Sequence, residues 1–175
     1  SCARPPVDAI LIAGRYDIVK NLPNQYLAAG ILNKVGGMRI LSVINQHTGA
    51  GGLDYLKTAY CQAVERQPWM NWSGFMEFLR TRVSLTFQAS FTESFNYLAL
   101  ESMMCGRPVV GSPAIRYLPK DWQANPDDAE SIVRVARRIM ADYGRHARTA
   151  REVSVSFAGQ MNQSYLAWFR RLTDR

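Results

Sequence analysis

Two glutamates, Glu93 and Glu101, are the residues of this chain whose type and spacing most clearly suggest chemistry. Glu93 stands just before a predicted helix over residues 96–105, and Glu101 lies on that helix. Because their spacing is a little over two helical turns, both carboxylates face roughly the same side at different heights. The pair is suited to hold one elongated polar ligand at two points. Taken singly, Glu93 would favour the helix dipole and Glu101 would face solvent.

Two cations follow an apolar run near the start of the chain. Gly14 and Arg15 come directly after a predicted buried strand over residues 7–13, and Lys20 stands a few residues later. Arg and Lys side chains stabilise phosphate oxygens and the negative charge that builds on a departing phosphate group. Because ligands of open α/β sheets bind at the carboxyl ends of the strands, this loop and the loop carrying Glu93 are expected to converge. The sequence therefore predicts an anion-binding site at that edge.

Strand-like apolar runs alternate with helical patterns along the chain, which predicts an α/β fold with a doubly wound parallel sheet. The predicted strands cover residues 7–13, 38–44, 69–72, 83–88 and 108–111. The predicted helices cover residues 24–34, 53–65, 77–81 and 96–105, and another begins after the capping signal at 125–128. A glycine-rich segment at 49–52 predicts a flexible loop. No internal repeat or linker divides the chain, so residues 1–175 are expected to form a single Rossmann-like domain.

The segment over residues 90–110 resembles the Glu-x7-Glu signature of retaining nucleotide-sugar glycosyltransferases with the GT-B fold, in particular the family 4 group. The usual form is Glu-Gly-Phe-Gly-x3-Glu-Ala-Met-Ala-x-Gly-x-Pro-Val-Val, and most of it is present here. Ser94 and Asn96 replace the two glycines of Gly-Phe-Gly, and both residue types tolerate tight turns and helix starts. The resemblance runs from about residue 7 to the C-terminus. It implies the C-terminal, donor-binding half of a GT-B fold.

The resemblance also implies a role for each residue of the predicted site. Arg15 and Lys20 would hold the diphosphate of the donor, and Glu101 would hold the ribose hydroxyls. Glu93 would contact the transferred sugar and steady its oxocarbenium-like transition state. The backbone around Trp72 would meet the nucleobase. The predicted catalytic residues are thus Glu93, Arg15 and Lys20, and the predicted donor-binding residues are Gly14, Arg15, Lys20, Ser94, Phe95, Asn96, Tyr97, Leu98 and Glu101.

No metal site or separate cofactor is expected, and the nucleotide-diphosphate sugar is the expected donor substrate. The two histidines and scattered acidic residues give no metal-binding spacing. Three cysteines, Cys2, Cys61 and Cys105, show no CxxC spacing, which indicates reduced thiols. The first residues lack a signal-peptide pattern, and no apolar run approaches the roughly 20 residues that span a bilayer. These features favour a cytoplasmic protein, or one peripheral to a membrane.

The chain is basic, with a formal net charge of +7, and 17 of its 21 basic residues are arginine. Much of the excess falls late in the chain, at Arg134, Arg137, Arg138, Arg145, Arg148, Arg151, Arg170 and Arg171. Three interpretations stay open. These arginines form a solvated helix face, dock on an anionic membrane surface, or attract an anionic acceptor such as nucleic acid.

A GT-B enzyme has two Rossmann-like domains, and the resemblance covers only the C-terminal one. The chain is therefore expected to be one domain of a longer protein, a cleavage product, or a half-enzyme completed by a partner chain. The last helix carries a periodic apolar face of Phe157, Met161, Tyr165, Trp168, Phe169 and Leu172. This face either covers the sheet of its own domain or packs on the missing N-terminal domain. If it is exposed, it predicts self-association.

Three functions follow from these observations. The leading hypothesis is the donor-binding domain of a retaining hexosyltransferase, of the kind used in polysaccharide biosynthesis, acting on a glycan or lipid-linked acceptor. This chain alone is expected to transfer little or nothing. A second hypothesis makes DNA or another anionic polymer the acceptor, because of the arginine excess. A third is a non-catalytic nucleotide-binding or assembly module. The altered Gly-Phe-Gly turn motivates it, and the presence of both glutamates argues against it.

Overall fold

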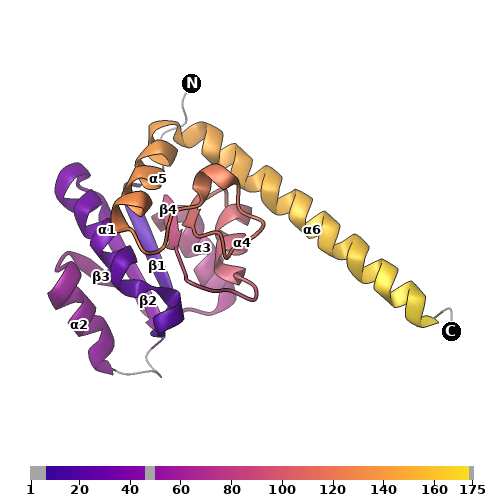
Figure 1. Cartoon of the computed structure of the whole chain (residues 1–175), viewed down its shortest axis with the longest axis horizontal. Coiled ribbons are helices and arrows are strands. Elements are labelled where there is room, and N and C mark those ends of the chain that lie inside the picture. The colour runs from indigo at the N-terminus through magenta and orange to yellow at the C-terminus, as the bar shows by residue number, and fades with distance from the viewer. Residues whose placement is uncertain (1–6, 46–49, 174–175) are drawn as a thin grey trace.

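A computed structural model describes residues 7–45 and 50–173 of the chain (Figure 1). Within them, one parallel sheet has the spatial strand order β3-β2-β1-β4-β5. The strands are β1 (Ala9–Arg15), β2 (Arg39–Asn45), β3 (Val64–Arg66), β4 (Leu85–Gln88) and β5 (Val109–Gly111). β1 pairs with β2 on one side and with β4 on the other, so the strand order reverses between β1 and β4. The doubly wound parallel sheet predicted from the sequence is confirmed.

Helices lie against both faces of the sheet. They are η1 (Ile18–Lys20), α1 (Leu22–Gly36), α2 (Ala50–Tyr60), α3 (Trp72–Arg82), α4 (Tyr97–Met104), η3 (Lys120–Trp122), α5 (Ala129–Ala141) and α6 (Tyr143–Thr173). α1 and α5 pack against each other on one face, and α3 covers the other. Such cover on both faces is typical of parallel sheets, and it explains why residues 9–13 of β1 and all of β4 are buried.

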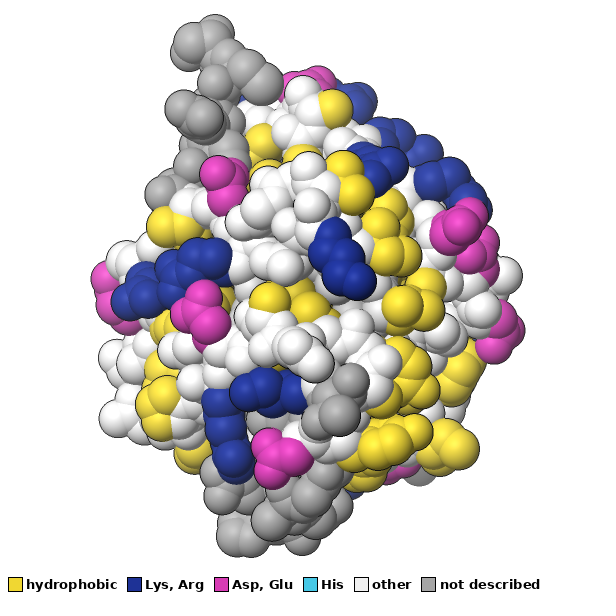
Figure 2. Space-filling model, turned by 90° about the vertical axis from the view of Figure 1, so that its left-hand side faces the viewer, with side chains coloured by type: hydrophobic (Ala, Val, Ile, Leu, Met, Phe, Trp, Pro, Cys, Tyr) yellow, Lys and Arg dark blue, Asp and Glu magenta, His cyan; other side chains and the backbone are white. Residues whose placement is uncertain are grey.

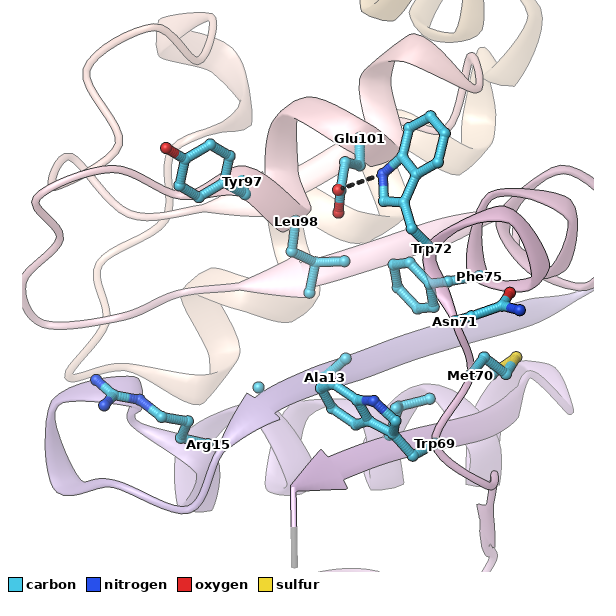
Figure 3. A pocket seen from close by; sticks show the side chains of 12 residues that line it. Ala13, Arg15, Trp69, Met70, Asn71, Trp72, Phe75, Tyr97, Leu98 and Glu101 are labelled. Atoms are coloured by element: carbon cyan, nitrogen blue, oxygen red, sulfur yellow. Dashed lines mark hydrogen bonds between the residues drawn. The ribbon is translucent and has the colours of Figure 1, made fainter. Parts of the chain in front are cut away.

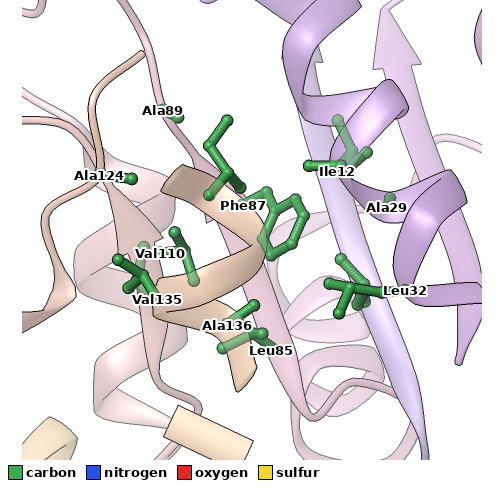
Figure 4. Close-up of a cluster of buried hydrophobic side chains, with 14 of the residues drawn as sticks. Ile12, Ala29, Leu32, Leu85, Phe87, Ala89, Val110, Ala124, Val135 and Ala136 are labelled. Atoms are coloured by element: carbon green, nitrogen blue, oxygen red, sulfur yellow. The ribbon is translucent and has the colours of Figure 1, made fainter. Parts of the chain in front are cut away.

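Alternation along β1 assigns its side chains to two cores. Ile10 and Ile12 point into the larger core, where α1 and α5 meet β4 and β5 (Figure 4). Ala9, Leu11 and Ala13 point to the opposite face, into a smaller core under α3. The strand is thereby buried on both sides, and only its carboxyl end, at Gly14 and Arg15, reaches the surface.

Two predicted elements between β2 and β4 are wrong. The third strand is Val64–Arg66, not residues 69–72, and it takes residues that the sequence placed in the helix over 53–65. Only Val64 of this short edge strand is buried, so it leaves little apolar signal. Trp72 instead begins α3, where the Asn71 side chain caps the helix by accepting a hydrogen bond from the Gly74 amide at 2.8 Å.

The glycine-rich segment also differs from its prediction. α2 begins at Ala50, so residues 50–52 are helical, and residue 49 lies outside the described residues. Tertiary contact of α2 with α1, through the buried Leu56, outweighs the low helix propensity of these glycines.

The helix carrying Glu101 is confirmed as α4. Asn96 caps its start, and Gly106, at φ +69°, provides the left-handed turn that leads into β5. Cys105, in this turn, is buried as a packing residue, and burial raises the pKa of its thiol. No helix in the described residues combines the length and apolar character needed to cross a bilayer.

α6 is a helix of 31 residues that packs on α4 near its start and then extends away from the body of the domain (Figure 1). Phe157 is half-buried against Phe95 and Tyr117, whereas Met161 is 51% exposed. Met161 thus does not cover the sheet of its own domain. The side chains of Tyr165, Trp168, Phe169 and Leu172 lie outside the described residues.

Candidate functional site

The loops after β1 and β4 converge at the point where the strand order reverses. Lys20, in η1, donates hydrogen bonds to both carboxylate oxygens of Glu93, at 2.7 Å to Oε1 and 2.8 Å to Oε2. These residues are distant in sequence, and adjacency of β1 and β4 brings them together. Open α/β sheets bind ligands at such a switch point.

Glu93 is held by a network of buried polar side chains. The Asn96 amide group donates to Glu93 Oε1 and to Gln88 Oε1, each at 2.9 Å. Gln88 in turn donates to the carbonyl of Ala13 at 2.9 Å, which ties the network to β1. The Glu93 side chain is only 5% exposed and that of Lys20 is 20% exposed. We call Lys20, Gln88, Glu93 and Asn96 the Glu93 cluster.

Positively charged N–H donors of Lys20 and Arg15 remain available for an anionic ligand. The two bonds to Glu93 use at most two of the three N–H donors of the Lys20 ammonium group, and no other side chain of the described residues accepts from it. Arg15 is more accessible, with 67% of its side chain exposed, and its carboxylate neighbour is Asp17, at 3.8 Å. An anion entering the large cavity from solvent would meet Arg15, which lines it.

The start of α4 offers fewer free amides than the sequence alone indicates. Asn96 Oδ1 accepts a hydrogen bond from the Ala99 amide at 2.9 Å, and the Asn96 carbonyl accepts one from the Leu100 amide at 3.3 Å. Within the described chain, the amides of Tyr97 and Leu98 have no acceptor. These two remain to bind an anion at the helix N-terminus.

A cavity of about 480 Å³ opens beside α4, and we call it the large cavity (Figure 3). Its lining residues are Ala13, Gly14, Arg15, Val43, Trp69, Met70, Asn71, Trp72, Phe75, Tyr97, Leu98 and Glu101. Figure 3 shows Arg15 at one end and Trp72, Phe75 and Asn71 toward the other. The cavity therefore joins a cationic end to a largely aromatic one.

Glu101 is the acidic residue of the large cavity, and its carboxylate accepts a hydrogen bond from Trp72. The distance from the indole Nε1 to Glu101 Oε1 is 3.0 Å. Burial raises the pKa of Glu101, and the hydrogen bond from Trp72 opposes part of that rise. Glu101 thus faces the cavity as a partly desolvated acceptor.

The structure divides the predicted site residues between two cavities. Gly14, Arg15, Tyr97, Leu98 and Glu101 line the large cavity. A second cavity, of about 440 Å³, is lined by Glu93, Ser94, Phe95 and Asn96, together with residues 114–117 and Phe157. The Tyr97 ring packs on that of Phe95, with centroids 4.6 Å apart, at the boundary between them. Lys20 lines neither cavity and reaches the site through Glu93.

The sequence places only the backbone around Trp72 near the nucleobase, and it does not predict the wall that side chains of residues 69–75 form. Its pattern predicts a strand over residues 69–72, whereas the side chains of Trp69 and Trp72 are 73% and 65% exposed and line the large cavity. The available signal is Asn71 itself, a residue type favoured at the N-cap of a helix. Sequence reasoning also missed Gln88, which looks like an ordinary strand residue until Asn96 is placed beside it.

The acidic, histidine and cysteine side chains of residues 7–45 and 50–173 are dispersed. No group of three or more His, Cys, Asp or Glu side chains there is placed to hold a metal ion. The expectation that the donor is bound without a metal stays a prediction.

Comparisons with known proteins find the fold but no sequence relative. No protein-family profile matches the chain, and no curated protein does either. The C-terminal domain of LpcC, a group 1 glycosyltransferase from Francisella tularensis, superposes with a TM-score of 0.72 and 17% identity. That match covers 85% of this chain and 84% of the LpcC domain.

Two larger proteins share the fold. Sucrose-phosphate synthase from Thermosynechococcus elongatus gives a TM-score of 0.67 at 19% identity, over 93% of this chain and 47% of the synthase. The E. coli trehalose-6-phosphate structure bound with UDP-2-fluoro glucose gives 0.67 at 16% identity, over 86% of this chain and 41% of that one. The chain therefore has the fold of the C-terminal domain of a GT-B glycosyltransferase, and it spans less than half of these two proteins.

Proposed function

We propose that this chain is the donor-binding domain of a retaining glycosyltransferase. It would take a sugar from a nucleotide-diphosphate sugar and pass it to a glycan or lipid-linked acceptor. The observation that carries the proposal is the large cavity at the strand switch point, which Arg15 and Glu101 line, together with the Lys20–Glu93 pair, whose Glu93 lines the second cavity. A protein of the same fold is bound with UDP-2-fluoro glucose, which supports a donor of this class.

The large cavity matches the parts of a nucleotide diphosphate in order. The nucleobase would lie against the aromatic end at Trp72, and the ribose would lie at Glu101. The diphosphate would reach Arg15, the remaining donor of Lys20, and the amides of Tyr97 and Leu98. The transferred sugar would then fall near Glu93, which lines the second cavity.

The chemistry assigned to these residues is electrostatic. As the bond to the sugar breaks, negative charge builds on the leaving diphosphate, and Arg15 and Lys20 stabilise it. Positive charge builds on the oxocarbenium-like sugar, and the Glu93 carboxylate would stabilise it. Because Lys20 and Asn96 already fix Glu93, little reorganisation is needed when the charges develop.

A second domain would supply the acceptor. The sucrose-phosphate synthase and the E. coli trehalose-6-phosphate protein are each more than twice as long as the region that this chain matches. In addition, α6 extends from the domain with Met161 exposed. We infer that an N-terminal domain or a partner chain packs there and completes the enzyme. Without it, α6 would promote self-association and the chain would transfer little or no sugar.

Calorimetric titration with UDP, GDP and ADP, and then with their sugar conjugates, tests the proposal. Saturable binding of one nucleotide is expected, weakened about 10-fold by Arg15→Ala because a charge-assisted hydrogen bond is lost. Arg134→Ala is the matched control, since Arg134 is an exposed arginine on α5, outside the lining of both cavities. The absence of any binding at millimolar nucleotide would contradict the proposal.

One observation favours a non-catalytic nucleotide-binding module as a second candidate. The Asn96 side chain occupies the Ala99 amide, so α4 presents fewer donors to a phosphate than a helix that begins with glycine. A module of this kind would bind nucleotide diphosphates without distinguishing their sugar conjugates. The same titrations therefore separate the two functions.

The arginine excess gives weaker support to a DNA-like acceptor. Arg134 pairs with Asp128 at 3.2 Å and Arg145 with Asp142 at 2.9 Å, so part of the charge is neutralised locally. The face in Figure 2 shows basic side chains in separate groups among acidic and uncharged ones, without one continuous basic surface. Salt-sensitive binding to duplex DNA would restore this alternative.

A further inference from the structure

We propose that Trp72 is a positioning residue for Glu101, and that the pair makes the site select ribonucleotides over deoxyribonucleotides. The inference rests on the nucleotide-binding function proposed above and concerns the same cavity. In this proposal, a contact between α3 and α4 determines how the site recognises the ribose of the nucleotide.

The contact joins the first residue of α3 to the middle of α4. Trp72 Nε1 donates to Glu101 Oε1 at 3.0 Å, and within the described chain no other hydrogen bond reaches this carboxylate. Figure 3 shows the two side chains meeting at the rim of the large cavity. A glutamate side chain has several rotatable bonds, so this one bond restricts its orientation.

The geometry leaves acceptor capacity for a ligand. An ionised carboxylate has about four lone-pair sites, and the indole occupies one of them. The vicinal hydroxyls of a ribose each need an acceptor. Because Trp72 fixes Oε1, both lone pairs of Oε2 and the second lone pair of Oε1 are positioned to accept from these hydroxyls. A ligand then loses less free energy in ordering the side chain.

Packing does not explain the position of Trp72. Its side chain is 65% exposed, and it belongs to neither hydrophobic core. The cap of α3 is supplied by Asn71, so the helix does not need the indole. A large aromatic side chain that is exposed at the rim of a cavity, with its N–H on a carboxylate, is suited to a ligand.

The electrostatics agree with this geometry. Burial raises the pKa of Glu101, and the indole N–H opposes the rise because it stabilises the charged form. A charged carboxylate accepts hydrogen bonds only, as two hydroxyl donors require. Trp72 thereby helps to keep Glu101 in the form that binds a ribose.

The chain offers a matched control in Trp69. It lines the same cavity and is 73% exposed, but its indole makes no hydrogen bond with any described residue. Trp72→Phe and Trp69→Phe each remove one indole N–H, and both reduce the aromatic area of the same cavity by the same amount. Only Trp72→Phe removes a bond to Glu101.

The test is to measure Kd for a ribonucleoside diphosphate and for its 2′-deoxy form, for example UDP and 2′-deoxy-UDP, with the wild type and both variants. We expect the wild type to prefer the ribonucleotide by about 10-fold, from a hydrogen bond to a charged group. Trp72→Phe should reduce the preference to about 2-fold, and Trp69→Phe should leave it near 10-fold, whatever either does to overall affinity. A thermal melt verifies that each variant is folded.

The outcomes separate this inference from the function on which it rests. Nucleotide binding with the same ribose preference in the wild type and Trp72→Phe would overturn the role of Trp72 and leave the donor site standing. An equal loss of preference in Trp69→Phe would also overturn it, since a general change of the cavity would then be the cause. Failure of the wild type to bind any nucleotide would overturn both.

Discussion

The two carboxylates of the site are held in different ways. Glu93 is almost fully buried and accepts hydrogen bonds from Lys20 and Asn96. Glu101 lies at the rim of the large cavity with one exposed indole as its partner. Buried polar networks are rigid and costly to disrupt, whereas exposed hydrogen bonds contribute little to stability. We therefore expect Glu93 to couple the site to the stability of the fold, and Glu101 to act mainly on ligand affinity.

Removing Lys20 should have the largest effect on stability. Lys20→Met leaves the buried Glu93 carboxylate without its cation, and we expect a loss of about 3 kcal/mol in the free energy of unfolding. The double variant Lys20→Met/Glu93→Gln should recover most of it, because no uncompensated charge remains. Urea denaturation measures both. A loss below about 0.5 kcal/mol for Lys20→Met would show that the Glu93 cluster is not a buried unit.

Asn96→Gly should separate stability from phosphate binding. It removes the hydrogen bond to Glu93 and weakens the cap of α4, so we expect a loss of about 1.5 kcal/mol in stability. It also frees the Ala99 amide, and we expect a nucleotide diphosphate to bind about 3-fold more tightly. Chemical denaturation and calorimetry report the two effects. Ser94→Gly, at an exposed neighbour, is the control that should leave stability unchanged.

Glu101→Gln should change nucleotide affinity strongly and the stability of the fold very little. We expect nucleotide affinity to fall about 10-fold, because a charge-assisted acceptor becomes a neutral amide. The free energy of unfolding should change by less than about 0.5 kcal/mol, since the residue lies on the surface rim. Calorimetry and urea denaturation of the same sample provide both numbers. A large loss of stability would remove the contrast between the two carboxylates.

The smallest effect is a pH dependence that Glu101 contributes. Burial raises its pKa in the folded state, so the folded chain holds this proton at a pH where the unfolded chain has lost it. Stability should therefore decline slightly as the pH rises from the ordinary pKa of a glutamate through the raised one. Nucleotide affinity should change in the opposite direction, because ribose binding needs the carboxylate. Glu101→Gln should remove this contribution to both slopes, as denaturation and calorimetry at several pH values would show.

The parts of the fold that were predictable are those whose burial is continuous in sequence. Residues 9–13 of β1 are an apolar run that is buried throughout, all four residues of β4 are buried, and Asn96 and Gly106 mark the ends of α4. β3 was not predictable in this way, since it is a short edge strand with one buried side chain. That single error displaced the start of α3 and concealed the aromatic wall of the large cavity.

The site was predictable as a set of residues but not as an arrangement. Motif spacing identified Glu93 and Glu101. The position of Arg15 and Lys20 after a predicted parallel strand implied that they lie at the same edge of the sheet. It did not reveal that Lys20 and Glu93 bind each other, because that contact depends on how two distant loops pack. Nor did it reveal that the Asn96 side chain takes an amide that a glycine would leave free.

The most direct test of a nucleotide-diphosphate site at the large cavity is an NMR titration of the ¹⁵N-labelled chain. Trp72 and Trp122 give indole N–H signals, and Trp122 is a buried internal reference that donates to His146 at 2.8 Å. With increasing UDP, GDP or ADP, we expect saturable shifts of the Trp72 indole and the amides of Gly14, Tyr97 and Leu98, with Trp122 unmoved. Unchanged signals at all four positions, or shifts confined to the arginines of α5 and α6, would contradict a donor site at this edge of the sheet.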